Sequence, residues 1–276
     1  MKTLSDYREQ KLPPSPSQND TDEYKNVQID RTASEFDEPL VDLAGYGIRT
    51  DPFYSRTDGL NQPVGRPFPF SLTHVYARRS VAHKLTEVNK LLRPYGMQVV
   101  VLDGFRTIAV QEALWTWMLE RGRKLLPLAS QNELTAFALR YATDPSTFKI
   151  EDAATWPTHA TGGAVDLTLE ETATGKPAYM GGIYLDSSMV SSIRYYEDAG
   201  LSESASHREA LRNRRLLFWC MTEAGFVNYA FEWWHFDYLT QASIMNLGMP
   251  PGLKAHYGLA NAGMAPAAER EGSGAK

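Results

Sequence analysis

The sequence has a single cysteine, no long hydrophobic run and no basic stripe. One cysteine in 276 residues, Cys220, excludes an intrachain disulfide framework. No apolar segment reaches the length that crosses a bilayer, so we expect no membrane partner. The net charge of −5, with Lys and Arg scattered along the chain, makes a nucleic-acid partner unexpected. The N-terminal residues lack the apolar core of a signal peptide, and we therefore expect a cytoplasmic protein.

The hydrophobic residues, 43% of the chain, suit one large globular domain. We place this domain at residues 26–258. Residues 1–25 are polar and contain Pro13-Pro14-Ser15-Pro16-Ser17. We expect them to form a flexible arm, because they carry too little apolar surface to offset the entropy of ordering. Residues 259–276 are rich in Ala, Gly and Glu, and we expect a flexible tail. The sequence does not indicate the oligomeric state.

Hydrophobic periodicity predicts helices and strands at uneven spacing, which is typical of an α+β fold. Ser206, with Glu209 three residues later, is the expected N-cap of the last long helix. We expect Arg212-Asn213-Arg214-Arg215 to lie on a solvated or ion-paired face of that helix. The predicted helices are 80–92, 109–120, 133–141 and 206–224; the predicted strands are 98–102, 164–169 and 226–239; and residues 48–70 are expected to form a long ordered loop.

Two stretches place ionisable side chains in apolar surroundings. Residues 158–169 read Thr-His-Ala-Thr-Gly-Gly-Ala-Val-Asp-Leu-Thr-Leu, and residues 231–238 read Phe-Glu-Trp-Trp-His-Phe-Asp-Tyr. Bare charges are costly there unless they are paired or bound to a metal. Two imidazoles and one carboxylate make a three-ligand zinc site with a fourth position open for water, and a further carboxylate would be the base for that water. The stretches therefore predict a metal-dependent hydrolase, built from His159, Asp166, Glu232 and His235.

The spacing of these residues constrains the local backbone. His159 and Asp166 are seven positions apart and would not converge on one straight element, but the intervening Gly162-Gly163 lets the chain turn. Glu232 and His235 would point to opposite faces of a regular strand, so we predict a bulge or a strand end there. The chain has six histidines, and the other four default to structural roles: His74, His83, His207 and His256.

These motifs, together with Asp103-Gly104-Phe105-Arg106, resemble the VanX-type D-alanyl-D-alanine dipeptidases of the M15 metallopeptidase family. The family pattern is a His, a Gly-x-Ala-x-Asp-Leu-Thr stretch and a later Glu-Trp-Trp-His, which stand here at residues 159, 162–168 and 232–235. The resemblance extends over about residues 40–240. It implies a hedgehog/DD-peptidase-like single domain, in which helices flank a small central antiparallel sheet, and one Zn²⁺ ion per chain.

The resemblance also implies a role for each site residue. Glu232 would be the catalytic base, Arg106 would hold the scissile carbonyl oxygen, and the zinc ligands would be His159, Asp166 and His235. In the family a Met-Gly-x-x-Phe-Asp segment supplies the carboxylate that binds the substrate ammonium. Here Met180–Asp186 has one residue more, and Asp186 is the corresponding candidate. The family has Ser two positions before the first His, where this chain has Pro157 without a hydroxyl, so Thr158 becomes the candidate for the substrate carboxylate.

The leading prediction is a zinc dipeptidase for D-alanyl-D-alanine or related small D-amino-acid dipeptides. Within the same family, a D,D-carboxypeptidase or endopeptidase acting on longer cell-wall peptides is the alternative. A non-haem iron oxygenase also uses two His and one carboxylate, but its His and Asp usually stand two residues apart. A non-catalytic protein with a structural metal would usually close its site with four ligands.

Overall fold

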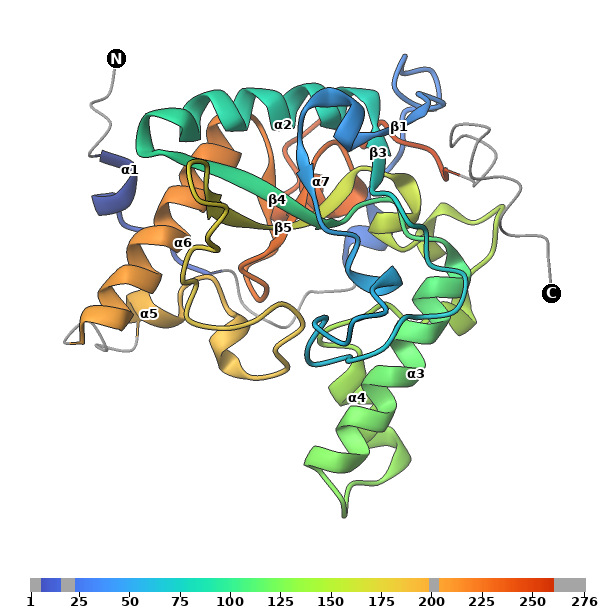
Figure 1. Cartoon of the computed structure of the whole chain (residues 1–276). Coiled ribbons are helices and arrows are strands. Elements are labelled where there is room, and N and C mark those ends of the chain that lie inside the picture. Colours follow the sequence, from blue (N-terminus) through green and yellow to red (C-terminus); the bar gives the residue numbers. More distant parts are fainter. Residues whose placement is uncertain (1–5, 16–22, 199–203, 261–276) are drawn as a thin grey trace.

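A mixed five-stranded sheet forms the centre of the computed structural model, which describes residues 6–15, 23–198 and 204–260 (Figure 1). The strand order is β2-β4-β5-β7-β6, and a separate pair joins β1 to β3. The β2–β4 pair is parallel, whereas the other pairs of the large sheet are antiparallel. The expectation of an entirely antiparallel sheet is therefore wrong at one edge. The strands are β1 (Leu40–Asp42), β2 (Arg49–Thr50), β3 (Tyr76–Arg78), β4 (Met97–Asp103), β5 (Ala164–Glu171), β6 (Val227–Asn228) and β7 (His235–Asp237).

Two long helices pack on one face of this sheet. Helix α2 (Arg79–Leu92) contacts β4, helix α6 (Ala205–Glu223) contacts β5, and the two helices contact each other. Alternate residues of β5 point into the core beneath them: Val165, Leu167 and Leu169 are all fully buried. Asp166 therefore points to the opposite face of the sheet. The strand alternation thus separates the hydrophobic core from the face that carries the ionisable side chains.

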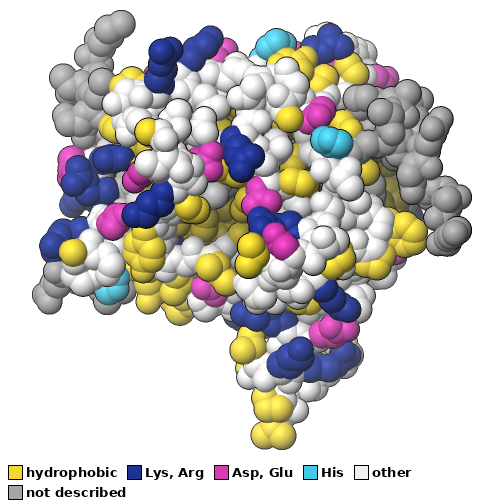
Figure 2. All heavy atoms as spheres, in the orientation of Figure 1, with side chains coloured by type: hydrophobic (Ala, Val, Ile, Leu, Met, Phe, Trp, Pro, Cys, Tyr) yellow, Lys and Arg dark blue, Asp and Glu magenta, His cyan; other side chains and the backbone are white. Residues whose placement is uncertain are grey.

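Helices α3 (Ile108–Leu125) and α4 (Gln131–Ala138) project away from the sheet as a hairpin (Figure 1). Ser130 and Glu133 form a capping box that starts α4, which ends before the predicted residue 141. The tip of the hairpin is apolar in Figure 2, and Leu128 there is 98% exposed. The shorter helices are α1 (Asp6–Glu9), α5 (Tyr195–Asp198), α7 (Gln241–Asn246) and the 3-10 turns η2 (Glu23–Asn26), η3 (Leu43–Tyr46), η4 (Phe53–Ser55), η5 (Arg93–Tyr95), η6 (Pro145–Thr147), η7 (Ala153–Thr155), η8 (Thr158–Thr161) and η9 (Met189–Ser191).

The N-terminal segment 6–15 is docked on the domain, contrary to the expectation of a flexible arm over residues 1–25. Leu12 is buried in the main core. Trp219 of α6 donates a hydrogen bond from Nε1 to the Gln10 carbonyl, and Arg194 donates to the Leu12 carbonyl. These side-chain donors and one apolar anchor offset the ordering entropy that composition alone suggested would prevail. Residues 1–5 and 16–22 of the predicted arm, and 261–276 of the predicted tail, lie outside the described residues.

The N-cap of helix α6 lies two residues before the predicted one. Ser204, not Ser206, is the N-cap, and its hydroxyl accepts a hydrogen bond from the His207 backbone N–H. The predicted ion pairs of the arginine cluster are confirmed for Arg215, which binds Glu197 through two nitrogens. Arg214 instead is fully buried and donates to the backbone carbonyls of residues 180, 190 and 192. In the part of the chain that is described, no helix combines the length and hydrophobicity of a membrane span.

Candidate metal centre

Strand register brings Asp166 and His235 together. Asp166 of β5 pairs directly with His235 of β7 on one side and with Asp103 of β4 on the other. Directly opposed residues on neighbouring strands have Cβ atoms about 5 Å apart. Three side chains from distant parts of the sequence therefore lie in a row across the sheet, on the face opposite α2 and α6.

His159 reaches the same point from η8, the turn that precedes β5. Gly162 ends this turn with φ +74°, and a Cβ there would lie 2.6 Å from the Leu40 side chain. A Cβ at Gly163 would lie 2.5 Å from the Tyr257 ring. Glycine is therefore required at both positions for the turn to pack this closely. The sequence prediction that Gly162-Gly163 lets the chain fold His159 back over the start of the strand is confirmed.

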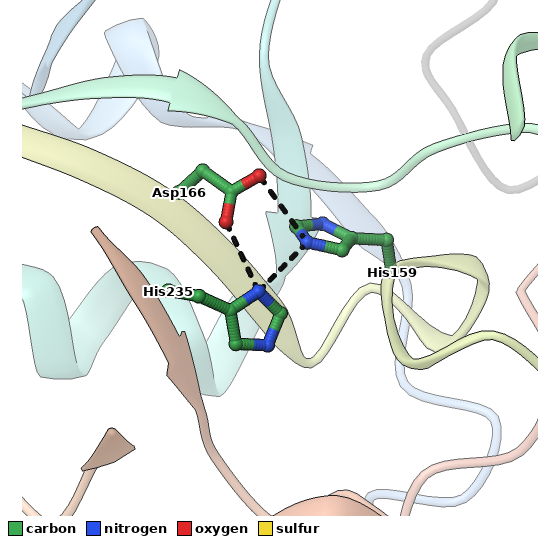
Figure 3. Close-up of side chains that lie close together, drawn as sticks. All are labelled: His159, Asp166 and His235. Carbon is green, nitrogen blue, oxygen red and sulfur yellow. Dashed lines mark hydrogen bonds and ion pairs between the residues drawn. The ribbon is translucent and has the colours of Figure 1, made fainter. Parts of the chain in front are cut away.

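The three predicted metal ligands form one cluster (Figure 3). His159, Asp166 and His235 each offer an atom such that all three atoms lie within 4.8 Å of one another, and all three residues are buried. His159 Nε2 is 3.2 Å from His235 Nδ1, and His235 Nδ1 is 3.0 Å from Asp166 Oδ1. His159 Nε2 is 3.4 Å from Asp166 Oδ2. The side chains thus converge on one point.

The far nitrogen of each imidazole is held by an acceptor. His159 Nδ1 lies 2.8 Å from the Gly104 carbonyl oxygen, and His235 Nε2 lies 2.9 Å from Asp237 Oδ2. Each of these nitrogens must carry a proton, so in the neutral imidazoles the two facing nitrogens present lone pairs to each other and to the Asp166 carboxylate. Such an arrangement requires a positive charge at its centre. Two imidazoles and a carboxylate fit Zn²⁺ with a fourth position left open.

The electrostatics of the cluster agree with a cationic occupant. Burial alone would lower the pKa of His235, but Asp237 and Asp166 raise it well above the usual value. Burial alone would raise the pKa of Asp166, but His159 and His235 hold it well below the usual range. The surroundings therefore favour a carboxylate at Asp166 and a positive charge at the nitrogen of His235 that faces it.

Arg106 is fixed beside the cluster by three side chains. Its Nε donates to Asp103 Oδ2 at 2.8 Å, Nη1 donates to Gln111 Oε1 at 2.9 Å, and Nη2 donates to Asp166 Oδ2 at 3.1 Å. Burial alone would lower the pKa of this guanidinium, but Tyr54, Asp103, Tyr184 and Asp166 raise it well above its usual value. Arg106 lines the cavity described below, where Nη1 has a second N–H, while Nη2 also lies 2.7 Å from Asp103 Oδ2. It is therefore a fixed cation next to the metal ligands.

Glu232 lies in the tight turn between β6 and β7. Its backbone N–H donates to the Tyr229 carbonyl, and the His235 backbone N–H donates to the Glu232 carbonyl. This turn ends where β7 starts, so the predicted strand end is confirmed. Glu232 Oε2 is 3.9 Å from His235 Nδ1. Burial raises the pKa of Glu232 to about 8, which marks a carboxyl group that binds a proton readily.

A cavity of about 330 Å³ opens over the cluster. Tyr24 of η2 and Met245 of α7 line one wall, and the segment 139–144 after α4 lines another. Thr158 lines the cavity beside His159, as do two basic residues, Lys25 and Arg140. Among the described residues, the lining includes Leu185 but not Asp186, whose Oδ1 accepts a hydrogen bond from the Ser188 backbone N–H. The structure therefore brings together every predicted site residue except Asp186.

Several residues that support the cluster were not singled out from the sequence. The sequence could have indicated Asp237, because it stands two positions after His235 on a strand and its side chain therefore lies on the same face. Asp103 and Gln111 hold Arg106, and Gln111 also donates to the Thr143 carbonyl in the cavity wall. Tyr184 donates to Asp166 Oδ2. Nothing in the local sequence indicated the contact of Gln111 with Thr143 or that of Tyr184 with Asp166, because each joins segments that are distant in the sequence.

The cluster has the ligand set of a metallohydrolase, two imidazoles and one carboxylate. The chain belongs to the Peptidase M15 family of D-Ala-D-Ala dipeptidases, whose model matches residues 65–249. It is a metallopeptidase, and the alternatives of an iron oxygenase and of a non-catalytic metal protein are set aside.

Several proteins described as D-alanyl-D-alanine dipeptidases are similar to this chain. The protein from Synechocystis is 30% identical over 151 residues, which cover 51% of this chain and 59% of that relative. The proteins from Enterococcus faecalis and Streptomyces coelicolor are 23% and 27% identical over 73% and 71% of this chain, and 91% and 89% of their own length. Among solved structures, a mutant of the vancomycin-resistance D,D-pentapeptidase VanY in complex with Zn(II) has a TM-score of 0.39 and 14% identity, over 84% of this chain and 97% of that chain.

Proposed function

We propose that this protein is a zinc-dependent dipeptidase that hydrolyses D-alanyl-D-alanine or related small D-amino-acid dipeptides. One observation carries the metal assignment: the facing nitrogens of His159 and His235 and the carboxylate of Asp166 converge, while the far nitrogens are held by acceptors. Zinc bound there would supply a Lewis acid and a water whose pKa falls to about 7. The relatives from Synechocystis and Enterococcus faecalis are named D-alanyl-D-alanine dipeptidases, which supports the choice of substrate.

Glu232 is proposed as the proton carrier. Its carboxyl group lines the cavity close to His235, and its raised pKa suits a group that accepts a proton from the attacking water and returns it to the leaving amine. Arg106 is proposed to stabilise the negative charge that develops on the scissile carbonyl oxygen. A guanidinium that is already held by Asp103 and Gln111 needs no reorganisation during the reaction, which is the requirement for electrostatic stabilisation.

Thr158 is proposed to bind the substrate carboxylate. It lines the cavity next to a proposed ligand, and the positive charges of Lys25 and Arg140 on the same lining favour an anionic end of the substrate. Asp186 is proposed, on the family resemblance, to bind the substrate ammonium. It directly follows the cavity-lining Leu185. We further propose that the enzyme acts in the cytoplasm on dipeptides from cell-wall turnover.

A second candidate is a D,D-carboxypeptidase on longer wall peptides. The position of Asp186 is the reason to test this activity. Among the described residues, Asp186 does not line the cavity, and its carboxylate binds the Ser188 backbone. A cavity without a carboxylate at the end that receives the substrate amine could admit a peptide that is extended there. Assays with two substrates separate the two activities: D-Ala-D-Ala itself, and an N-acetylated tripeptide that has one further D-Ala before D-Ala-D-Ala. Cleavage of the dipeptide alone supports the dipeptidase, and faster cleavage of the N-blocked peptide supports the carboxypeptidase.

The Glu232→Gln variant tests the proposal directly. Gln keeps the shape of the side chain but cannot carry the proton, so we expect bound zinc to remain near one per chain while kcat falls by about 10²- to 10⁴-fold. Glu223→Gln, at the exposed end of α6, is the matched control and should leave kcat unchanged. Turnover by Glu232→Gln at the rate of the control would contradict the assigned role. Activity that survives chelation would contradict the dependence on zinc.

A further inference from the structure

Tyr184 places a hydroxyl on one oxygen of Asp166. Its hydroxyl is 2.6 Å from Asp166 Oδ2, and the two residues are 5% and 2% exposed. The same Oδ2 accepts a hydrogen bond from Arg106 Nη2 at 3.1 Å. Oδ1 carries neither of these bonds and lies 3.0 Å from His235 Nδ1, whereas Oδ2 lies 3.4 Å from His159 Nε2. The two carboxylate oxygens are therefore in different environments.

The direction of the hydrogen bonds is fixed by their acceptor. An ionised carboxylate can only accept, so the Tyr184 hydroxyl must donate to Asp166. The Tyr54 hydroxyl lies 2.9 Å from the Tyr184 oxygen and must in turn donate to it. The result is a short chain from Tyr54 through Tyr184 to Asp166, in which each bond polarises the next. Both tyrosines are buried, which raises the pKa of each hydroxyl and keeps it protonated.

We propose that Tyr184 is a positioning residue that makes Oδ1 of Asp166 the single metal-binding oxygen. Two donors occupy Oδ2, whereas Oδ1 accepts from neither of them, so the lone pairs of Oδ1 remain for a metal held by His159 and His235. A carboxylate that binds through one oxygen leaves a coordination position open for substrate. This inference rests on the metal centre proposed above and adds a residue to it that carries no ligand atom.

The loop that carries Tyr184 is held rigidly enough for this role. Arg214 donates to the Met180 carbonyl at its start, and Tyr196 donates to the Gly181 carbonyl. Leu185, directly after Tyr184, adopts φ +60° while it is buried, a costly conformation for a leucine that the surrounding packing maintains. The Tyr184 ring packs edge-on against Trp234 with centroids 5.5 Å apart. The hydroxyl therefore has little freedom to leave Asp166.

Three successive residues of this loop contact different parts of the structure. Met180–Asp186 is one residue longer than the family segment that it resembles. In this longer loop Tyr184 points to Asp166, Leu185 lines the cavity, and the Asp186 carboxylate binds the Ser188 backbone. The segment thus supplies a hydroxyl to the proposed metal centre, where a phenylalanine would supply none.

Zinc affinity, measured by competition with a chromogenic chelator, tests this proposal. Tyr184→Phe keeps the ring and removes the hydroxyl, and loss of a group that orients a metal ligand typically weakens binding 10- to 100-fold. Tyr54→Phe is the matched control, because it removes a hydroxyl from the same buried pair but leaves the bond to Asp166. Since polarisation adds about 10–30% to a hydrogen bond, we expect less than about a fivefold change in the control.

Two further measurements separate positioning from general destabilisation. In the metal-free state Tyr184→Phe should lose more thermal stability than Tyr54→Phe, because it breaks two buried hydrogen bonds and the control breaks one. With Co²⁺ in place of zinc, Tyr184→Phe alone should change the visible absorption, as Asp166 becomes free to bind through both oxygens. Tyr184→Leu provides the same zinc test if the Phe variant does not fold.

The outcomes distinguish this inference from the proposed function. If the unaltered chain binds zinc and the hydroxyl-free variants bind it within about twofold, the role of Tyr184 is overturned and the metal centre stands. If the unaltered chain binds no zinc, both are overturned. A loss of affinity in Tyr184→Phe that Tyr54→Phe matches would also overturn the assignment, because it would show only the effect of a disturbed aromatic cluster.

Discussion

Asp237 offers a quantitative test of how the structure prepares His235 for a metal. Asp237 is 1% exposed, and its Oδ2 accepts from His235 Nε2 at 2.9 Å while its Oδ1 accepts from the Thr240 hydroxyl at 2.8 Å. Asp237→Asn keeps the shape, and the amide oxygen can still accept from the imidazole. The variant therefore removes the charge and leaves the hydrogen bond.

The size of the effect follows from this difference. A hydrogen bond to a charged group contributes about 1.5–3 kcal/mol, and one between neutral groups about 0.5–1.5 kcal/mol. The lost charge is thus worth about 1–1.5 kcal/mol, which is roughly a tenfold weaker affinity for zinc. Asp237→Ala removes the acceptor altogether, so we expect a loss towards a hundredfold.

Chelator competition at constant pH gives the dissociation constants, with Glu170→Gln as the control. Glu170 is another buried carboxylate on the sheet, four residues beyond Asp166 on β5, and it accepts from the Gln98 side chain. This control tests whether any loss of buried negative charge weakens the metal. The reasoning would be refuted if Asp237→Asn bound zinc as tightly as the unaltered chain. It would also be refuted if Glu170→Gln lost as much zinc affinity as Asp237→Asn.

Three further predictions concern the supporting structure and Arg106. Gly181→Ala should destabilise the fold by about 1–3 kcal/mol more than Gly175→Ala in thermal denaturation, because both have positive φ but only the Gly181 Cβ would meet a side chain, 2.3 Å from the Tyr196 ring. Ser204→Ala should cost about 1 kcal/mol of unfolding free energy as the loss of an N-cap, whereas Ser206→Ala should change it by less than about 0.5 kcal/mol; equal effects would contradict the observed cap. Arg106→Lys should lower kcat by about 10²- to 10³-fold in a steady-state assay, since an ammonium cannot reproduce the fork; an unchanged kcat would remove Arg106 from the mechanism.

The metal ligands could be predicted because their chemistry is local. A histidine or carboxylate within an apolar stretch is costly without a partner, and His159, Asp166 and His235 each stand in such a stretch. The pairing that brings Asp166 and His235 together is not local. It depends on β5 and β7 being neighbours in the sheet, although β6 and α6 lie between them in the sequence. Residue types therefore predicted the members of the site, and the sheet supplies their geometry.

The errors in the prediction also have physical causes. Ser206 and Glu209 fit the pattern of a capping box, but Ser204 offers the same hydroxyl two residues earlier and starts the helix there. The polar composition of residues 6–15 concealed one apolar anchor, Leu12, and could not reveal the donors on α6 that bind this segment. The hydroxyl pair of Tyr54 and Tyr184 joins residues 130 positions apart, a distance over which no sequence pattern operates.

One shift of register in β4 connects the fold to the chemistry. Val101 pairs with Leu167, so a regular antiparallel ladder would place Asp103 opposite Val165, on the face packed by α2 and α6. The register instead shifts between Val101 and Asp103, and Asp103 pairs with Asp166. Because successive side chains alternate between faces, a shift of one residue turns the Asp103 carboxylate from the core to the proposed metal centre. There it binds Arg106 and lies 3.6 Å from His159 Nδ1. The irregularity predicted near His235 thus has a counterpart on β4, where it orients the carboxylate that holds Arg106 in place.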